Sequence, residues 1–245
     1  MTRWRIDLSY DGTDFAGWQV QPGHTTLQGT VESVLATLDG STVKVHASGR
    51  TDQGVHARLQ PIHCDLARSW EPVRLRRGLN GLLPPDIRVL RVRRVAATFH
   101  ARRSVREKEY RYFIWNEDMV PPCLRRYRTQ VARPLDVPAM RKAAARLVGK
   151  HDFASFTANP NRVVESTVRR VSRVSVIRRG REIVIVATGE GFLYRMVRSL
   201  AGFLIRVGEG RMTPEDGERI LAARARTAHV ETAPAQGLFL WNVRY

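Results

Sequence analysis

Apolar and polar residues in the first half of the chain recur with two different periods. Residues 4–10 alternate at every second position, as a strand does, whereas apolar residues from Leu27 to Leu38 recur at helical spacing and stop at Gly40. Pro61 interrupts one short apolar run, and because proline lacks a backbone N–H we expect that strand to be irregular or to lie at a sheet edge. The predicted elements are strands at 4–10, 43–46, 59–66 and 87–95 and helices at 26–40 and 71–83.

The second half of the chain repeats this mixture. Two alternating runs flank Arg179-Gly180, which predicts a hairpin. Apolar residues from Leu193 to Val207 form one stripe that indicates a buried helix face, and Thr213 is placed to cap the helix that follows. The predicted elements are strands at 107–115, 168–177, 182–188 and 237–245 and helices at 137–148, 192–207 and 214–225.

This order of elements predicts an α+β (mixed α/β) protein. The hairpin implies antiparallel pairing, and a sheet must bury its apolar face against another layer. We therefore expect two similar halves, each a largely antiparallel sheet with helices on one face. The N-terminal half is predicted at residues 1–100 and the C-terminal half at residues 101–245.

Charge narrows the range of partners. The chain has 41 Lys and Arg against 23 Asp and Glu, a net charge of +18, and the arginines gather in several groups. An excess of this size favours a polyanionic partner, nucleic acid first, over a merely solvated surface or an anionic membrane surface. We expect no membrane span and, from the absence of an apolar leader, a cytoplasmic protein. The two cysteines form neither a zinc pattern nor a disulfide framework.

The stretch ASGRTDQGVHA places Arg50, Asp52 and His56 around two glycines, Gly49 and Gly54. By spacing alone it is either a polar turn or a loop that presents Asp52 to a ligand, since glycine and aspartate are common in turns. The five histidines from position 46 to position 151 show no metal-ligand spacing. We expect no metal, because no acidic cluster is present to support one.

Two further segments admit two interpretations each. In KEYRYFIWN, alternation places Tyr110 and Tyr112 on one strand face, where they are either buried or available to stack on a base. In the helix over 192–207, Arg195, Arg198, Gly202 and Arg206 fall away from the apolar stripe. That second helix face is either solvated or lines a cleft, with an arginine paired to a carboxylate.

Several motifs resemble the tRNA pseudouridine synthase A family. GRTDQGVHA is similar to the GRTDxGVHA signature of that family, and YDGTDFAGWQVQ, NGLLPPDI, FHARRSVREKEYRYFIWN, GKHDFASF and GFLYRMVRSLAGFLIRVG follow in the family's order. The resemblance covers nearly the whole chain. It implies a pseudouridine-synthase fold with a central basic cleft, a homodimer, and a tRNA partner. The implied reaction converts uridine to pseudouridine in the anticodon stem-loop, at tRNA positions 38–40, without metal or redox cofactor because it is an isomerisation.

The resemblance also implies residue roles. Asp52 is the expected nucleophile, and Arg198 the guanidinium that offsets desolvation of its carboxylate. Tyr110 is expected to stack on the flipped base and to assist removal of the ring-carbon proton, while Arg50 holds the opened RNA. Tyr112 is not expected to be catalytic. The chain departs from the family pattern at Gln53, Arg195 and Ser199, which bears on tRNA preference more than on the reaction.

Two rival functions remain at this level. A non-catalytic basic RNA-binding protein would share the charge, the sheets and the aromatic residues but would not need Asp52. A metal-dependent nuclease could use Asp11, Asp14 and Asp52 around a magnesium ion.

Overall fold

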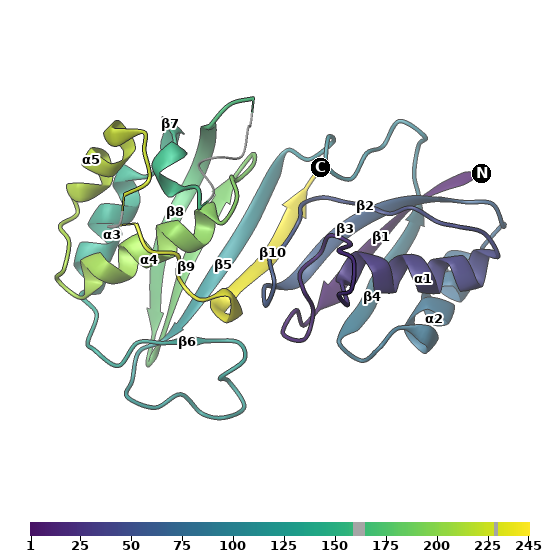
Figure 1. Ribbon diagram of the computed structural model, residues 1–245, viewed down its shortest axis with the longest axis horizontal. Helices are drawn as coiled ribbons and strands as arrows, with labels where there is room; N and C mark the ends of the chain where they lie inside the picture. Colours follow the sequence, from purple (N-terminus) through teal and green to yellow (C-terminus); the bar gives the residue numbers. More distant parts are fainter. Residues whose placement is uncertain (159–164, 228–229) are drawn as a thin grey trace. The chain divides into compact units, whose positions relative to one another are not determined.

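The computed structural model describes residues 1–158, 165–227 and 230–245, and these form two compact units (Figure 1). Unit 1 comprises Met1–Arg106 together with Phe239–Tyr245, and unit 2 comprises Glu107–Leu238. The chain therefore returns to unit 1 at its C-terminal end. A single division near residue 100 does not anticipate this return.

Unit 1 is a mostly antiparallel sheet with two helices. Strand β1 lies between β3 and β4 and is antiparallel to both, while β2 pairs antiparallel and β10 parallel with β3. The two helices contact each other, and α2 packs on β4. The elements are β1 (Thr2–Tyr10), α1 (Leu27–Asp39), β2 (His46–Ala47), β3 (His56–Leu66), α2 (Pro72–Leu82), β4 (Ile87–Arg94) and β10 (Leu238–Arg244).

The ends of α1 confirm the sequence prediction. Thr26 is the N-cap, and its side chain accepts a hydrogen bond from the Gly29 N–H. Gly40 takes the left-handed conformation with φ of 74° and donates its N–H to the Ala36 carbonyl. Glycine adopts this conformation without the steric penalty that a Cβ brings, so the helix ends where the apolar spacing stops.

Strand β3 confirms one half of the expectation about Pro61 and corrects the other: its register against β1 shifts between Leu8 and Tyr10, close to Pro61. The strand is not at an edge, because it lies between β1 and β10. The Pro61 carbonyl accepts the Ser48 N–H at 2.9 Å, and a residue's N–H and C=O point to the same side of a strand. The missing N–H of Pro61 therefore falls on the β2 side, and Pro61 keeps its place opposite Asp7 of β1. The strand expected at 43–46 is reduced to His46–Ala47.

Unit 2 is also a largely antiparallel sheet, in the order β5-β9-β8-β7, with β6 parallel to β5. The predicted hairpin is confirmed, and its turn contains Gly180 with φ of 59°. Helix α3 packs on β8 and contacts both α4 and α5. The elements are β5 (Glu107–Trp115), β6 (Thr129–Gln130), α3 (Val137–Arg146), β7 (Gly149–Asp152), η1 (Ala154–Phe156), β8 (Val168–Arg179), β9 (Glu182–Gly189), α4 (Met196–Gly208), α5 (Asp216–Ala223) and η2 (Ala235–Gly237).

Two helices begin later than their apolar patterns predict. Arg195 has a left-handed φ of 55°, so α4 starts at Met196 rather than at Phe192. Helix α5 starts at Asp216, and Thr213 is not its N-cap. Thr213 instead donates its backbone N–H to the Asp216 carboxylate at 2.7 Å, which closes the turn before the helix.

Both units thus match the predicted fold class, a mixed α+β protein with largely antiparallel sheets. No helix within the described ranges is long and apolar enough to cross a membrane.

Candidate active site

The loop over residues 47–57 joins β2 to β3, and its backbone is tied to the strand that follows it. The Ser48 hydroxyl bonds to the Gln60 side chain at 2.5 Å, and Gln60 Nε2 donates to the Gly49 carbonyl at 2.6 Å. Ser48 and Gln60 are fully buried. A buried side-chain pair that bridges loop and strand fixes the loop's entry, because breaking it would leave polar atoms without partners.

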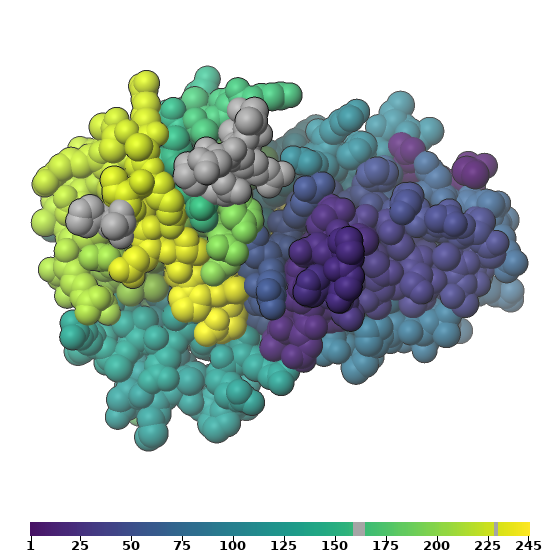
Figure 2. Space-filling view, viewed as in Figure 1, coloured from purple at the N-terminus to yellow at the C-terminus, as the bar shows by residue number. Residues whose placement is uncertain are grey.

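A second set of contacts ties this loop to residues 11–18. The Tyr10 hydroxyl bonds to the Thr51 hydroxyl at 2.8 Å, and the Trp18 N–H donates to the Thr51 carbonyl at 2.9 Å. At Gly12 a Cβ would lie 2.0 Å from the Val55 carbonyl oxygen, and at Gly17 it would lie 3.0 Å from that of Thr51. The two loops approach so closely that only glycine fits. The N-terminal residues that form this part of the surface of unit 1 are dark purple in Figure 2.

Asp52 lies near the tip of the loop, half-buried, and Arg50 is exposed. The Val55 N–H donates to the Asp52 carbonyl at 3.1 Å, and Gly54 has a φ of 74°, so a tight turn follows the carboxylate. The two interpretations of this stretch, a polar turn and a loop that presents Asp52, are therefore compatible. The turn is held on both sides and keeps Asp52 partly accessible. A carboxylate held this way can act as a nucleophile or as a base.

His56, the first residue of β3, contacts the neighbouring loop over residues 11–18 and strand β10. It is fully buried, and its Nδ1 lies 3.1 Å from the Gly12 N–H and 3.0 Å from Asp11 Oδ1. Its ring stacks on Phe239 with centroids 4.6 Å apart. These contacts make His56 part of the scaffold that joins residues 11–18, β3 and β10.

The two tyrosines of β5 have different environments. Tyr112 is fully buried, and its hydroxyl bonds to Thr129 at 2.5 Å and to the Pro234 carbonyl at 2.9 Å. Burial raises the pKa of Tyr112, and both hydrogen bonds of its hydroxyl are made within unit 2. Tyr110 is 8% exposed and meets the Phe192 ring edge-on, with centroids 5.3 Å apart. The apolar pattern predicts a helix from Phe192, but Phe192 lies before α4 and its ring packs against Tyr110.

Arg198 lies on a face of α4 that the segment 230–234 covers. Its Nε donates to the Ala233 carbonyl at 2.8 Å, and the Ala233 N–H donates back to the Arg198 carbonyl at 3.1 Å. Gly202 lies further along the same face, where a Cβ would stand 2.3 Å from the Glu231 carbonyl oxygen. Arg206 pairs with the Glu231 carboxylate at 2.5 Å. The solvated interpretation of this face is therefore wrong for Arg198, Gly202 and Arg206.

No pattern in the sequence predicts the covering segment. Residues 230–234 have no periodic pattern, and Arg226 anchors them. Arg226 donates to the Val230 carbonyl at 2.6 Å and to the Ser199 hydroxyl at 3.0 Å. Ser199, one of the departures from the family pattern, is thus the buried partner of an arginine. The other two departures, Gln53 and Arg195, are exposed.

The expected site residues fall into two pairs. Asp52 and Arg50 share one loop of unit 1. Tyr110 on β5 and Arg198 on α4 belong to unit 2, where these two elements contact each other.

Within the described residues, no three His, Cys, Asp or Glu side chains are grouped so that they could hold a metal ion. Asp11, which the nuclease hypothesis needs, accepts hydrogen bonds from the backbone and hydroxyl of Thr13, at 3.0 and 2.6 Å. Asp11 Oδ1 thus stabilises the turn at residues 11–13.

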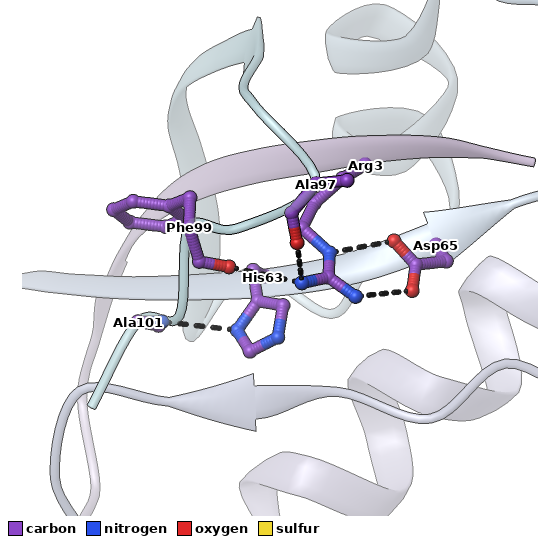
Figure 3. Close-up of polar contacts among 6 residues, drawn as sticks. All are labelled: Arg3, His63, Asp65, Ala97, Phe99 and Ala101. Carbon is purple, nitrogen blue, oxygen red and sulfur yellow. Dashed lines mark hydrogen bonds and ion pairs between the residues drawn. The ribbon is translucent and has the colours of Figure 1, made fainter. Parts of the chain in front are cut away.

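A polar cluster formed by Arg3, His63 and Asp65 holds the segment 97–101, which leads toward Arg106 (Figure 3). Arg3 makes a two-point contact with Asp65, at 2.8 and 2.7 Å, and also donates to the carbonyls of Ala97 and Phe99. His63 accepts the Ala101 N–H at 3.1 Å. His46 and His100 lie against His63, with ring centroids 4.9 and 4.7 Å away. His46 is stacked on His63, and the His100 ring is tilted against both.

Fold and loop geometry together define a basic, mixed α+β protein that presents one carboxylate from a glycine-bounded turn. The model of the tRNA pseudouridine synthase family matches residues 8–102 and 143–245, which include Asp52, Arg50 and Arg198 but not Tyr110. The chain therefore belongs to this family of isomerases.

Curated relatives match over the whole length. The chain is 46% identical to tRNA pseudouridine synthase A of Brevibacillus brevis, with all of both chains covered. It is 46% identical to the enzyme of that name from Halalkalibacterium halodurans, over 97% of this chain and 90% of that one. It is 47% identical to the one from Solidesulfovibrio magneticus, over 100% and 92%.

Among solved structures, the archaeal box H/ACA sRNP Nop10–Cbf5 complex contains a chain that matches 83% of this chain and 43% of its own. Identity is 14% and the TM-score is 0.36, which is too weak a likeness to define the fold.

Proposed function

We propose that this protein converts uridine to pseudouridine in tRNA, at positions 38–40 of the anticodon stem-loop, with Asp52 as the nucleophile. Family membership over the full length supports the reaction. The net charge of +18 supports an RNA substrate. The single observation that carries the role of Asp52 is its half-buried position in a turn fixed on both sides.

The reaction rearranges one nucleotide without any net change in atoms. The bond from N1 of uracil to the ribose C1′ breaks, and a bond from C5 to C1′ forms. The C5 proton leaves, and N1 gains a proton. Because atoms and electrons balance within one molecule, a nucleophile and a route for one proton are sufficient, and the chain's own side chains can supply both.

The remaining roles follow the same proposal. Tyr110 stacks on the extruded base and takes part in removing the C5 proton, and its edge-on contact with Phe192 fixes its ring. Arg198 offsets desolvation of the Asp52 carboxylate, and its Nε bond to Ala233 orients the guanidinium fork. Arg50, exposed beside Asp52, holds the backbone of the opened RNA.

The location and assembly belong to the proposal as well. The protein acts in the cytoplasm, where tRNA is processed, and as a homodimer across which one tRNA contacts both subunits. Family resemblance supports both statements. Sedimentation of the purified protein at micromolar concentration tests the second, because a monomer would contradict it.

Purified protein incubated with unmodified tRNA in EDTA provides the test. We expect pseudouridine to form and the RNA to stay intact, and we expect the Asp52→Asn variant to lose activity by at least about 10³-fold, because a neutral amide is a poor nucleophile. Pseudouridine is measured after digestion of the RNA, and strand integrity on a denaturing gel.

Asp14→Asn is the matched control, because Asp14 is an exposed aspartate in the neighbouring loop. It should keep its activity. Unmodified uridine with the wild-type protein would favour the non-catalytic RNA-binding alternative. Metal-dependent cleavage that Asp14→Asn abolishes would favour the nuclease.

A further inference from the structure

Arg226 joins three separate parts of unit 2. One terminal nitrogen of its guanidinium group donates hydrogen bonds to the Thr157 carbonyl at 3.1 Å and the Ser199 hydroxyl at 3.0 Å. The other donates to the Val230 carbonyl at 2.6 Å and the Thr232 hydroxyl at 2.8 Å. One side chain therefore ties the residue after η1 to helix α4 and to the covering segment.

The four acceptors are neutral, so the contribution of Arg226 is geometric. Two of them are backbone carbonyls and two are hydroxyls. A guanidinium group is planar and directs its N–H groups along fixed lines, whereas an ammonium group is a point charge without such a fork. A lysine at this position would therefore keep the charge but lose the hydrogen-bond pattern.

The start of the covering segment depends mainly on Arg226. Val230 is buried, and Arg226 bonds to its carbonyl and to the hydroxyl two residues further on. In the described part of the chain, one other polar side-chain contact is made at this end, between Arg206 and the exposed Glu231 at 2.5 Å. An exposed ion pair contributes little, because solvent screens it. Loss of Arg226 would therefore release residues 230–232.

The other end of the covering segment holds Arg198. Arg198 Nε donates to the Ala233 carbonyl at 2.8 Å, and the Ala233 N–H donates back to the Arg198 carbonyl at 3.1 Å. This contact restricts rotation of the guanidinium plane, because Nε lies at the base of the group. The next residue, Pro234, accepts the buried Tyr112 hydroxyl at 2.9 Å. The covering segment thus links Arg198 to β5, the strand that also carries Tyr110.

We propose that Arg226 is a positioning residue for the reaction. It holds the covering segment against α4, and the Ala233 carbonyl of that segment orients the Arg198 guanidinium group. This role rests on the proposed function, in which Arg198 offsets desolvation of the Asp52 carboxylate. Without Arg226 the guanidinium group loses its fixed direction and the ionised carboxylate loses stabilisation. The expected defect is therefore in catalysis and not in RNA binding.

Arg226→Gln tests this role. The rate of pseudouridine formation is measured in single turnovers at saturating enzyme, and the Kd for tRNA by fluorescence anisotropy in the Asp52→Asn background. We expect the rate to fall about 10- to 100-fold, because a small misplacement of a catalytic group is enough for such a loss. The Kd should stay within about twofold, because the phosphate contacts that dominate affinity are unchanged.

Two further measurements separate positioning from a purely structural role. The acidic limb of the pH–rate profile should move to higher pH in Arg226→Gln, since the ionised nucleophile is less stabilised. A residue that only stabilises the fold would leave the shape of this profile unchanged. In the Arg198→Gln background, Arg226→Gln should lower the rate by less than about twofold more, because both changes remove the same interaction.

Arg226→Lys and Arg224→Gln are the matched variants. Arg226→Lys keeps the charge without the fork, so it should have nearly the same defect as Arg226→Gln. Arg224→Gln removes the same charge two residues away, at an exposed side chain, and should keep its activity. Urea unfolding of each variant gives the folded fraction, so that every rate refers to folded protein.

Several results would overturn the positioning role of Arg226. They are a Kd that rises in step with the loss of rate, full activity of Arg226→Lys, an equal loss in Arg224→Gln, an unshifted pH profile, and a full further loss in the Arg198→Gln background. A wild-type protein that forms no pseudouridine would overturn the proposed function. An active Arg226→Gln variant beside an active wild type would overturn the positioning role alone, so the two failures are distinguishable.

Discussion

At the scale of single residues, the glycines that matter most for the candidate site lie outside the motif that contains Asp52. Gly54 has a positive φ, as its place in a turn suggests, but Gly49 does not. Gly12 and Gly17 instead let residues 11–18 approach the Asp52 loop, where any Cβ would collide with a backbone carbonyl. The turn chemistry of both stretches is visible in the sequence. Their contact with each other is not, because some forty residues separate them.

His63 gives the folded chain a dependence on acid. Burial is the main cause that lowers the pKa of His63 to about 4 from its ordinary 6.5, and His100, His46 and Arg3 lower it further. The folded-state pKa lies below the unfolded-state pKa, so the unfolded chain binds the proton first. Stability should therefore fall as pH falls from about 6.5 to about 4, by on the order of 1–2 kcal/mol after allowance for solvent screening.

Urea unfolding at several pH values measures this effect. His63→Gln keeps an acceptor for the Ala101 N–H and should flatten the pH dependence above pH 4. His24→Gln, at an exposed histidine, should leave it unchanged. Below about pH 4, protonation of Asp65 adds a separate loss, because its pKa is lowered by the hydrogen bond from Arg3. A wild-type protein equally stable at pH 6.5 and 4.5 would contradict the assignment.

At the scale of elements, α4 differs most from its apolar pattern. The apolar pattern predicts one buried stripe, yet the opposite side of the helix is covered as well, by residues 230–234. The burial of this second side depends on a tertiary contact. It cannot be predicted from the sequence, because residues 230–234 have no periodic pattern. One consequence is that the Arg198 side chain is held in place by the Ala233 backbone carbonyl.

Gly202→Ala tests this close packing. The new Cβ would stand 2.3 Å from the Glu231 carbonyl oxygen, so the helix and the covering segment must separate. We expect a loss of about 1–3 kcal/mol in the free energy of unfolding, measured by urea denaturation. Gly81→Ala is the matched control, because Gly81 is also helical and a Cβ there meets nothing within 4 Å. The control should gain up to about 1 kcal/mol from helix propensity. Equal stabilisation of both variants would exclude the proposed packing.

At the scale of the whole molecule, the C-terminal strand connects the two ends of the sequence. Residues 239–245 belong to unit 1, although more than 130 residues of unit 2 precede them. The last residue, Tyr245, bonds through its hydroxyl to the Ala101 carbonyl at 2.8 Å. Its ring lies 4.3 Å from the guanidinium carbon of Arg5, which is buried in an ion pair with Asp7. Unit 1 is therefore complete only after the whole chain has been made.

Tyr245→Ala should weaken unit 1 selectively. Loss of the ring exposes the buried Arg5–Asp7 pair to water, and we expect about 1–3 kcal/mol of destabilisation. Hydrogen exchange read by mass spectrometry should show faster exchange in β1 and β3 and unchanged exchange in β8 and β9. Tyr245→Phe, which removes only the hydroxyl, should have a smaller effect. Equal acceleration in both units would argue against the division of the chain described here.

The sequence by itself determined the local elements and the family. Period and capping placed most strands and helices, because a strand's alternation, the Thr26 cap and the left-handed Gly40 are properties of neighbouring residues. The motif around Asp52 and the excess of arginine indicated the chemistry and the partner in the same way. All of this information lies within short stretches of chain.

Only the tertiary structure decided how distant stretches meet. It placed Pro61 inside the sheet of unit 1, covered the second face of α4, and returned the C-terminal strand to unit 1. The physical reason is that such contacts depend on which surfaces lose water together, and a residue's neighbours in sequence carry no record of that.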